Sequence, residues 1–158
     1  MYSGVESEFL VSHRYIAYTD GGVRGGNPGV AGWGFYLLDT QERVTEHGRG
    51  ILPGAQTNNF AEYAAVYHLL SYAKSKNISS IDINCDSQLV VKQLNGVWDV
   101  KFDAMRWIFS ATLSMLSELD SKIQWIPRSQ NKLADRLVEE MLDKHTGRTR
   151  NGKKVVNN

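Results

Sequence analysis

The sequence lacks most features of an exported, disulfide-linked or membrane protein. Its 158 residues include one cysteine, Cys85, and three prolines. A single cysteine excludes an internal disulfide and favours a reducing compartment. No run of about 18 apolar residues is present, which argues against a membrane-spanning helix or a membrane partner. Residues 1–13 carry two glutamates and no basic cluster ahead of an apolar run, so they do not resemble a targeting peptide. We predict a cytoplasmic protein.

The residues that are present suffice for one compact domain. The apolar content is 42%, and a chain of this length can bury a core that folds unaided. We divide the sequence into an N-terminal extension (1–13), one folded domain (14–143) and a C-terminal tail (144–158), and we expect a monomer.

The C-terminal tail holds an excess of positive charge. Residues 144–158 carry five basic and no acidic side chains, whereas residues 1–143 contain all 17 acidic residues and the other 13 basic ones. A basic tail that contains Gly and Asn is typical of a solvated, flexible terminus. The alternative is an arm that contacts nucleic-acid phosphates in a salt-dependent way.

Hydrophobic patterning predicts an α/β fold. Strands are expected at 15–20, 32–39, 43–51, 80–86 and 122–126, and helices at 58–77, 87–95, 103–119 and 131 to about 143. Three consecutive strands followed by alternating helices and strands indicate a mixed sheet with helices on both faces. Right-handed crossovers place the fourth and fifth strands beside the first and parallel to it, which gives the strand order 3-2-1-4-5.

Asp20 ends the first predicted strand, in the sequence TDGG. Asp-Gly is a turn signal, so a hairpin turn is one interpretation. The segment 21–32, GGVRGGNPGVAG, is too long for a two-residue turn, and its glycines would let the backbone approach a sugar-phosphate chain closely. A turn and a functional site are equally consistent with Asp20.

Glu62 lies near the start of the first predicted helix. Asn59 and Glu62 have the spacing of a capping box. On a helical period, however, Glu62 shares its face with Val66, Leu69 and Ala73. A carboxylate at the head of an apolar stripe is unfavourable unless it is paired or bound to a cation, which favours a functional role.

Asp86 and Asp135 each have an ordinary structural explanation. Asp86 follows a strand and precedes a helix, where it is either the N-cap of that helix or part of a site at the carboxyl end of the strand. Asp135 lies in a first helical turn, where the helix dipole favours an acidic residue. The predicted topology nevertheless brings Asp20, Glu62, Asp86 and Asp135 to one edge of the sheet.

Four carboxylates at one edge repel each other strongly unless cations neutralise them. Oxygen ligands suit Mg²⁺ or Mn²⁺, and no Cys/His cluster suggests zinc. Two such ions, bound together with substrate, can support in-line displacement at a phosphodiester. The pattern therefore indicates a metal-dependent phosphodiesterase.

Four motifs, YTDGG with GNPGVAGWG, TNNFAEYAA, CDSQLVVKQLNG and WIPRSQNKLADRL, occur in order between about residues 14 and 143. Together they resemble the type 1 ribonuclease H family. The resemblance implies a ribonuclease H-like fold and an endonuclease that hydrolyses the RNA strand of RNA–DNA hybrids, leaving 5′-phosphate and 3′-hydroxyl ends. It also implies an Asp-Glu-Asp-Asp site for two metal ions, formed by Asp20, Glu62, Asp86 and Asp135.

The same resemblance implies substrate contacts. Asn27 matches a position that contacts the RNA strand, Asn58 and Gln88 match positions that reach 2′-hydroxyls and bases, and Thr57 and Asn59 resemble a pocket for a DNA phosphate. Amides and hydroxyls can donate to phosphates and accept from a 2′-OH. Helix capping is the alternative role of Thr57 and Asn59, and it is compatible with phosphate binding.

The sequence departs from many family members in two places. It lacks the Lys-rich handle, because residues 95–107 pass directly into a long helix; Trp98 there either lines the DNA channel or packs at the helix junction. The loop 127–132, PRSQNK, has no histidine. Arg128 occupies that neighbourhood, where a guanidinium can bind phosphate but cannot act as a general base. We do not assign the role of the missing histidine to His145, since a tail histidine is usually solvated.

Three other functions compete with this interpretation. A non-catalytic hybrid-binding module predicts loss of a carboxylate, yet all four are present. A related nuclease for double-stranded RNA or a DNA junction is less compatible with the amides at Asn27, Asn58 and Gln88. An ATP-binding domain on a similar sheet needs a second lobe that 158 residues cannot supply.

Overall fold

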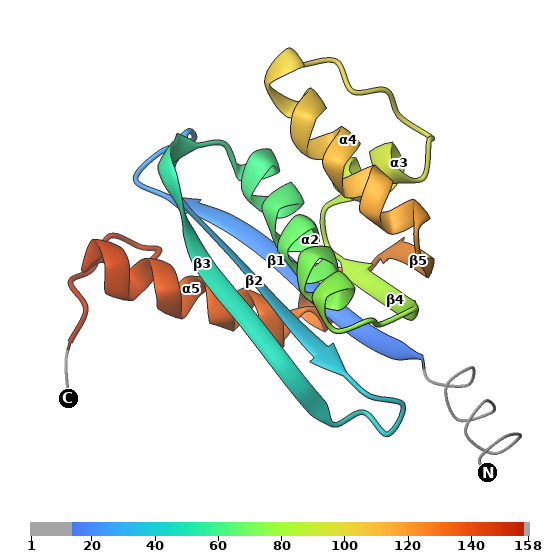
Figure 1. Ribbon diagram of the computed structural model, residues 1–158. Coiled ribbons are helices and arrows are strands. Elements are labelled where there is room, and N and C mark those ends of the chain that lie inside the picture. Colours follow the sequence, from blue (N-terminus) through green and yellow to red (C-terminus); the bar gives the residue numbers. More distant parts are fainter. Residues whose placement is uncertain (1–13, 157–158) are drawn as a thin grey trace, which may run out of the picture.

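The computed structural model describes residues 14–156, which form a five-stranded sheet covered by helices on both faces (Figure 1). The strands are β1 (Tyr15–Arg24), β2 (Gly29–Leu38), β3 (Val44–Gln56), β4 (Ser80–Cys85) and β5 (Asp120–Trp125). The helices are α2 (Asn58–Ser75), α3 (Gln88–Leu94), α4 (Asp103–Ser117) and α5 (Lys132–Thr146), with a 3-10 turn η1 (Arg128–Gln130) before α5.

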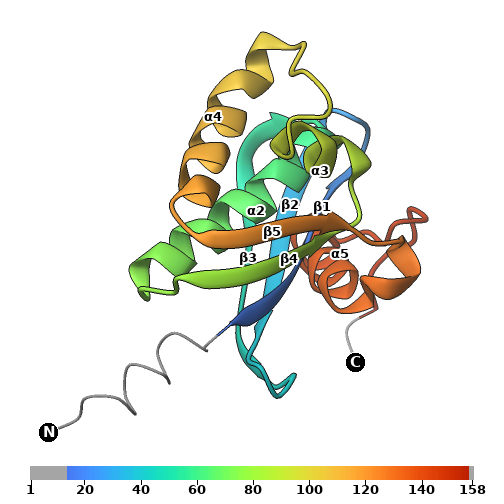
Figure 2. The same ribbon diagram turned by 90° about the vertical axis from the view of Figure 1, so that its right-hand side faces the viewer.

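The strand order is β3-β2-β1-β4-β5, which confirms the predicted sheet. β2 is antiparallel to both β1 and β3, whereas β4 runs parallel to both β1 and β5. Helices α2, α3 and α4 cover one face and α5 covers the other (Figures 1 and 2). This arrangement brings the carboxyl end of β4 beside the middle of β1, where the starts of α2 and α5 also contact β1.

The core lies mainly between the sheet and α2. Helix α2 buries residues around most of its circumference, because strands contact one side and α4 the other. Its Leu69 and Leu70 are fully buried, as are Ile81 and Ile83 of β4. The paired strands β1 and β4 therefore lie at the centre of the sheet, against the core.

The glycine-rich segment after Asp20 forms paired strands and not a long loop. β1 continues to Arg24 and β2 begins at Gly29, with Asp20 opposite Gly34 in the ladder. The turn is limited to residues 25–28, where Gly25 and Gly26 adopt positive φ angles. The interpretation of Asp20 as a turn residue is wrong, because antiparallel pairing with β2 carries the strand four residues past it.

The C-terminal region differs from the expectation of a solvated tail. Helix α5 runs to Thr146, past the boundary predicted at 143, and ends at Gly147 with a left-handed φ of 70°. Residues 147–156, here called the C-terminal loop, fold back through an isolated bridge between Arg148 and Lys154. Arg150 of this loop and Arg24 of β1 both form ion pairs with Glu139 of α5, and these pairs hold the loop against the domain.

The predicted N-terminal extension, residues 1–13, lies outside the described residues. Among helices in the described part of the chain, none has the length and apolar character needed to cross a membrane.

Candidate metal centre and nucleic-acid interface

Three of the four predicted carboxylates meet at one edge of the sheet. Asp20 comes from β1, Glu62 from the second turn of α2, and Asp86 from the residue after β4. Each offers an oxygen, and these oxygens lie within 4.8 Å of one another. Asp20 and Glu62 are only 4% and 5% exposed, so water can solvate their charges only poorly, and a charged form needs a partner or a cation.

A close helix–strand contact creates this arrangement. The backbone N–H of Gly21 donates a hydrogen bond to Oε1 of Glu62 at 2.5 Å. A Cβ on Gly21 would lie 2.2 Å from the backbone carbon of Ala61, so only glycine lets α2 approach β1 this closely. The close approach predicted for the glycines is therefore made at Gly21 by a helix of the protein itself.

The cap of α2 differs from the predicted capping box. Thr57 is the N-cap, and its Oγ1 accepts from the backbone N–H of Phe60 at 3.1 Å. Asn59 lies inside the helix and not at its cap, Glu62 is five residues past Thr57, and the Glu62 carboxylate accepts from β1 instead. The capping interpretation of Glu62 is wrong, because Thr57 already satisfies the helix end.

Crowding shifts the protonation of the buried pair. Burial, and then the charge of Asp86, raise the pKa of Asp20 from 3.8 to about 7, and the charge of Asp135 adds to this. Burial and the charges of Asp20 and Asp86 raise the pKa of Glu62 well above its usual value. Burial and mutual repulsion of this kind are the conditions that a bound cation would relieve.

Asp86 is free to take part because a neighbour caps α3. Ser87 is the N-cap, and its side chain accepts from the backbone N–H of Val90. The N-cap interpretation of Asp86 is therefore wrong. Oδ2 of Asp86 instead accepts a 3.2 Å hydrogen bond from Nδ2 of Asn131, and the Trp125 indole donates to its backbone oxygen.

Asn131 is a site residue that sequence reasoning missed. It is 1% exposed, and its Nδ2 also donates to the backbone oxygen of Thr19 at 2.8 Å. It thereby links the start of α5 to β1 and to the Asp86 carboxylate. The feature of the sequence that could have identified Asn131 is its position within the motif WIPRSQNKLADRL, four residues before Asp135.

Asp135 lies outside the three-carboxylate cluster. It occupies the first turn of α5, as predicted, and its charge still influences the pKa of Asp20. Its Oδ1, however, accepts a 3.0 Å ion-pair hydrogen bond from Arg150 of the C-terminal loop. The cluster of oxygens that could share a cation therefore contains Asp20, Glu62 and Asp86 but not Asp135.

The donor set fits a hard divalent cation. It consists of carboxylate oxygens, which are the ligands that Mg²⁺ and Mn²⁺ prefer. The one cysteine, Cys85, is buried, and burial raises the pKa of its thiol well above the usual value, so it is a poor thiolate ligand.

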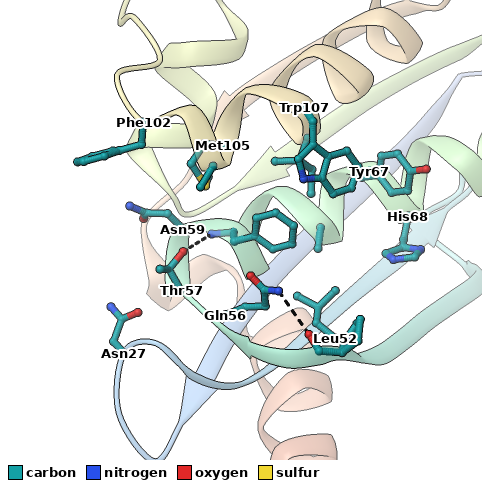
Figure 3. A pocket seen from close by; sticks show the side chains of 15 residues that line it. Asn27, Leu52, Gln56, Thr57, Asn59, Tyr67, His68, Phe102, Met105 and Trp107 are labelled. Carbon is teal, nitrogen blue, oxygen red and sulfur yellow. Dashed lines mark hydrogen bonds between the residues drawn. The ribbon is translucent and has the colours of Figure 1, made fainter.

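Four of the residues predicted to bind substrate, Asn27, Thr57, Asn58 and Asn59, lie around the start of α2. Oδ1 of Asn27, in the β1–β2 turn, accepts a 2.9 Å hydrogen bond from the backbone N–H of Asn58. Asn27 and Asn59 are exposed, and they lie with Thr57 at one end of a groove of about 670 Å³ between β3, α2 and α4 (Figure 3). The rest of the groove is apolar and aromatic, including Phe60 and Trp107.

Three predicted substrate residues lie away from that groove. Gln88 is exposed at the first residue of α3, beside Asp86. Trp98 is 44% exposed, and the Lys92 ammonium of α3 lies 4.5 Å from its ring centroid, so Trp98 packs on α3 while part of its ring stays open to solvent. Arg128 is exposed in η1, three residues before Asn131.

Comparison with known proteins gives consistent matches over most of the chain. The family model described as reverse transcriptase-like matches residues 18–141. A curated ribonuclease HI from Halobacterium salinarum is 38% identical over 131 residues, which cover 82% of this chain. The bifunctional protein Rv2228c of Mycobacterium tuberculosis is 32% identical over 133 residues, also 82% of this chain. The chain spans 65% of the Halobacterium protein and 36% of Rv2228c.

Solved structures show the same relationship. The N-terminal ribonuclease H domain of Rv2228c, solved as a fusion with maltose-binding protein, superposes with a TM-score of 0.79 at 31% identity, over 85% of this chain and 97% of that one. The Halobacterium salinarum enzyme gives 0.78 at 37% identity, over 83% and 98%. LC11-RNase H1, solved in complex with an RNA/DNA hybrid, gives 0.77 at 32% identity, over 84% and 99%.

Proposed function

Because the chain belongs to the type 1 ribonuclease H family, we propose that it is an endonuclease that hydrolyses the RNA strand of RNA–DNA hybrids. The observation that carries the proposal is the cluster of Asp20, Glu62 and Asp86, whose oxygens lie within 4.8 Å of one another at a sheet edge. The complex of LC11-RNase H1 with an RNA/DNA hybrid supports the choice of substrate.

The cofactor we propose is Mg²⁺, with Mn²⁺ as a substitute. Asp20, Glu62 and Asp86 would hold one ion, and Asp135 would complete a second position when substrate is bound. Two divalent ions in such a site supply an activated water and stabilisation of the leaving oxygen. Cleavage on the 3′-oxygen side of the phosphorus leaves 5′-phosphate and 3′-hydroxyl ends.

The protein side chains orient the hybrid. Asn58 is the first residue of α2, four residues before Glu62, and Gln88 is the first residue of α3, two residues after Asp86. Their amides can read 2′-hydroxyls from these positions. Thr57 and Asn59 face the groove in which a DNA phosphate would bind (Figure 3). Asn27 contacts the RNA strand and Trp98 the DNA strand. Arg128 stabilises developing charge but takes no proton.

We also propose that the protein acts as a cytoplasmic monomer. A second candidate activity is cleavage of double-stranded RNA. It is favoured by the absence of a Lys-rich handle in residues 95–107, since a shorter binding surface contacts less of the DNA strand.

Cleavage of end-labelled RNA–DNA hybrid, double-stranded RNA and double-stranded DNA with Mg²⁺ or Mn²⁺ tests the proposal. We expect internal cuts in the RNA of the hybrid, which Asp20→Asn abolishes. Asp120→Asn is the matched control, because Asp120 is an exposed carboxylate paired with Arg14. Absence of hybrid cleavage by the parent protein, or persistence of cleavage in Asp20→Asn, would contradict the proposal.

A further inference from the structure

The C-terminal loop carries a cation to the edge of the carboxylate site. One nitrogen of Arg150 lies 3.0 Å from Oδ1 of Asp135 and 2.6 Å from Oε1 of Glu139. These contacts raise the pKa of Arg150 above its already high value, so the group is always charged. The guanidinium therefore lies against the Asp135 carboxylate, where a metal ion bound by Asp135 would also place positive charge.

The position of Arg150 is built into the fold. Arg24 of β1 is 8% exposed and pairs with Oε2 of Glu139 and Oδ1 of Asp143, both at 2.7 Å. Its guanidinium also donates to the backbone oxygen of Arg148, which ties the C-terminal loop to the sheet. Glu139 thus bridges the two arginines, one through each oxygen.

The loop has its own hydrogen bonds. The backbone N–H of Thr149 donates to the oxygen of Lys153 at 2.7 Å, and that of Gly152 donates to the oxygen of Thr149 at 2.9 Å. Arg150 lies within this closed turn. Its side chain is 51% exposed, so it can leave Asp135 without disturbing a buried core.

We propose that Arg150 is an internal counter-ion of Asp135 that competes with a divalent cation for this carboxylate. The proposal rests on the proposed metal-binding role of Asp135. Two positive groups cannot both approach one carboxylate without repulsion, and removing the guanidinium removes that repulsion. Arg150 thereby weakens cation binding on the Asp135 side and leaves the Asp20, Glu62 and Asp86 side unaffected. The consequence is one stronger and one weaker cation position.

Titration of the full chain with Mn²⁺, with free Mn²⁺ followed by electron paramagnetic resonance, measures this directly without any substrate. We expect Arg150→Gln to tighten the weaker Mn²⁺ site by about three- to tenfold, a modest factor because the ion pair is partly exposed and screened. Arg150→Lys keeps the charge and should bind Mn²⁺ as the parent does.

Two further variants separate competition from a structural effect. Arg148→Gln removes the same charge from the same loop, but among the described residues its guanidinium donates to the backbone oxygen of Gly152, at 3.5 Å, and to no carboxylate, so Mn²⁺ binding should not change. In an Asp135→Asn background, Arg150→Gln should have no further effect. Thermal unfolding provides a second readout, since Mn²⁺ should raise the Tm of Arg150→Gln by more than that of the parent.

Unchanged or weaker Mn²⁺ binding in Arg150→Gln, or an equal gain in Arg148→Gln, would overturn the inference. A loosened loop would lower the Tm with and without Mn²⁺ but would not tighten a metal site. Failure of the parent to cleave hybrids, with the Mn²⁺ shift still present, would overturn the proposed function alone.

Discussion

The backbone N–H of Gly21 donates to the carboxylate of Glu62, so the strand residue next to Asp20 also fixes the helix carboxylate beside it. One contact thereby sets the distance between two of the three clustered acids. It depends on the missing side chain of Gly21, because a Cβ there would overlap the backbone of Ala61.

Gly21→Ala should therefore lower both stability and activity. The added Cβ would lie 2.2 Å from a backbone carbon that cannot rotate away, so α2 must shift from β1. We expect a loss of at least about 2–3 kcal/mol in the free energy of unfolding, as for severe overpacking. Urea unfolding and hybrid cleavage measure the two effects. Gly22→Ala is the control, because its Cβ would meet only the side chains of Val138 and Leu142, at ordinary distances of 3.5 and 3.7 Å.

In the metal-free protein, the contribution of the carboxylate site to the free energy of unfolding should decrease as the pH rises from about 4 to 7. Because the pKa of Asp20 is raised to about 7 and that of Glu62 is also raised, the folded state keeps protons that the unfolded chain has released. Stability decreases with pH wherever the folded state binds more protons. Divalent cations should remove the effect by replacing those protons.

This contribution is isolated by comparing the parent protein with Glu62→Gln. The free energy of unfolding of each is measured with urea, in the presence of a chelator, at pH 5 and at pH 7.5. Burial lowers the pKa of His68, which makes stability rise with pH up to about its unfolded value, but both proteins share that effect. The parent should lose more stability, or gain less, than Glu62→Gln over this interval. Equal pH dependence in the two proteins would contradict the prediction.

Asn131→Ala should weaken Mn²⁺ binding as well as the fold. It removes the donor that orients Asp86 and leaves the oxygen of Thr19 without that partner. We expect a loss of about 1–3 kcal/mol in stability. Asn84→Ala is a close match, since Asn84 is also buried and donates to a β1 oxygen, that of Ala17, without touching a site carboxylate. Only Asn131→Ala should reduce Mn²⁺ affinity.

Arg24→Gln should destabilise the protein by roughly 2–4 kcal/mol, because it leaves Glu139 and Asp143 without their buried cation. The C-terminal loop should also become more accessible to trypsin, since its tie to β1 is lost. Arg43→Gln serves as the control; Arg43 is 71% exposed in its pair with Asp39, so its removal should cost less than about 1 kcal/mol.

Arg128→Ala should reduce kcat/KM on hybrids by about three- to tenfold and lower the slope of log KM against log salt by about one. These effects follow if the exposed Arg128 side chain binds a phosphate near the site. Arg43→Ala, in the β2–β3 turn at the other end of β2, should leave the salt dependence unchanged. Equal salt slopes for Arg128→Ala and the parent would assign Arg128 no phosphate contact.

The sequence predicted the type and order of the elements because their hydrophobic periods are local. The 3.6-residue pattern of residues 58–77 became α2, and the apolar run around Ile81 became the central β4. Boundaries were less accurate where pairing decided them. β1 extends to Arg24 because β2 supplies hydrogen-bond partners, which no local property of the glycines revealed.

Local reasoning about the helix caps was correct in part. Helix capping was considered for Thr57 and Asn59, and Thr57 is the cap of α2; Asp86 was considered as the cap of α3, but Ser87 is the cap there. Several residues near each helix start could serve chemically. Which residue becomes the cap depends on where the preceding strand ends, and the pairing of strands in the sheet determines that end.

The sequence by itself determined the α/β topology, and its four motifs identified Asp20, Glu62, Asp86 and Asp135 as candidates. Only the tertiary structure decided which of them meet: three share a cluster, while Asp135 pairs with Arg150. It also revealed Asn131 and the close approach at Gly21. The physical reason is range. Periodicity and capping act over a few residues, but charge pairing, burial and steric contact depend on distances between residues that only the folded chain brings together.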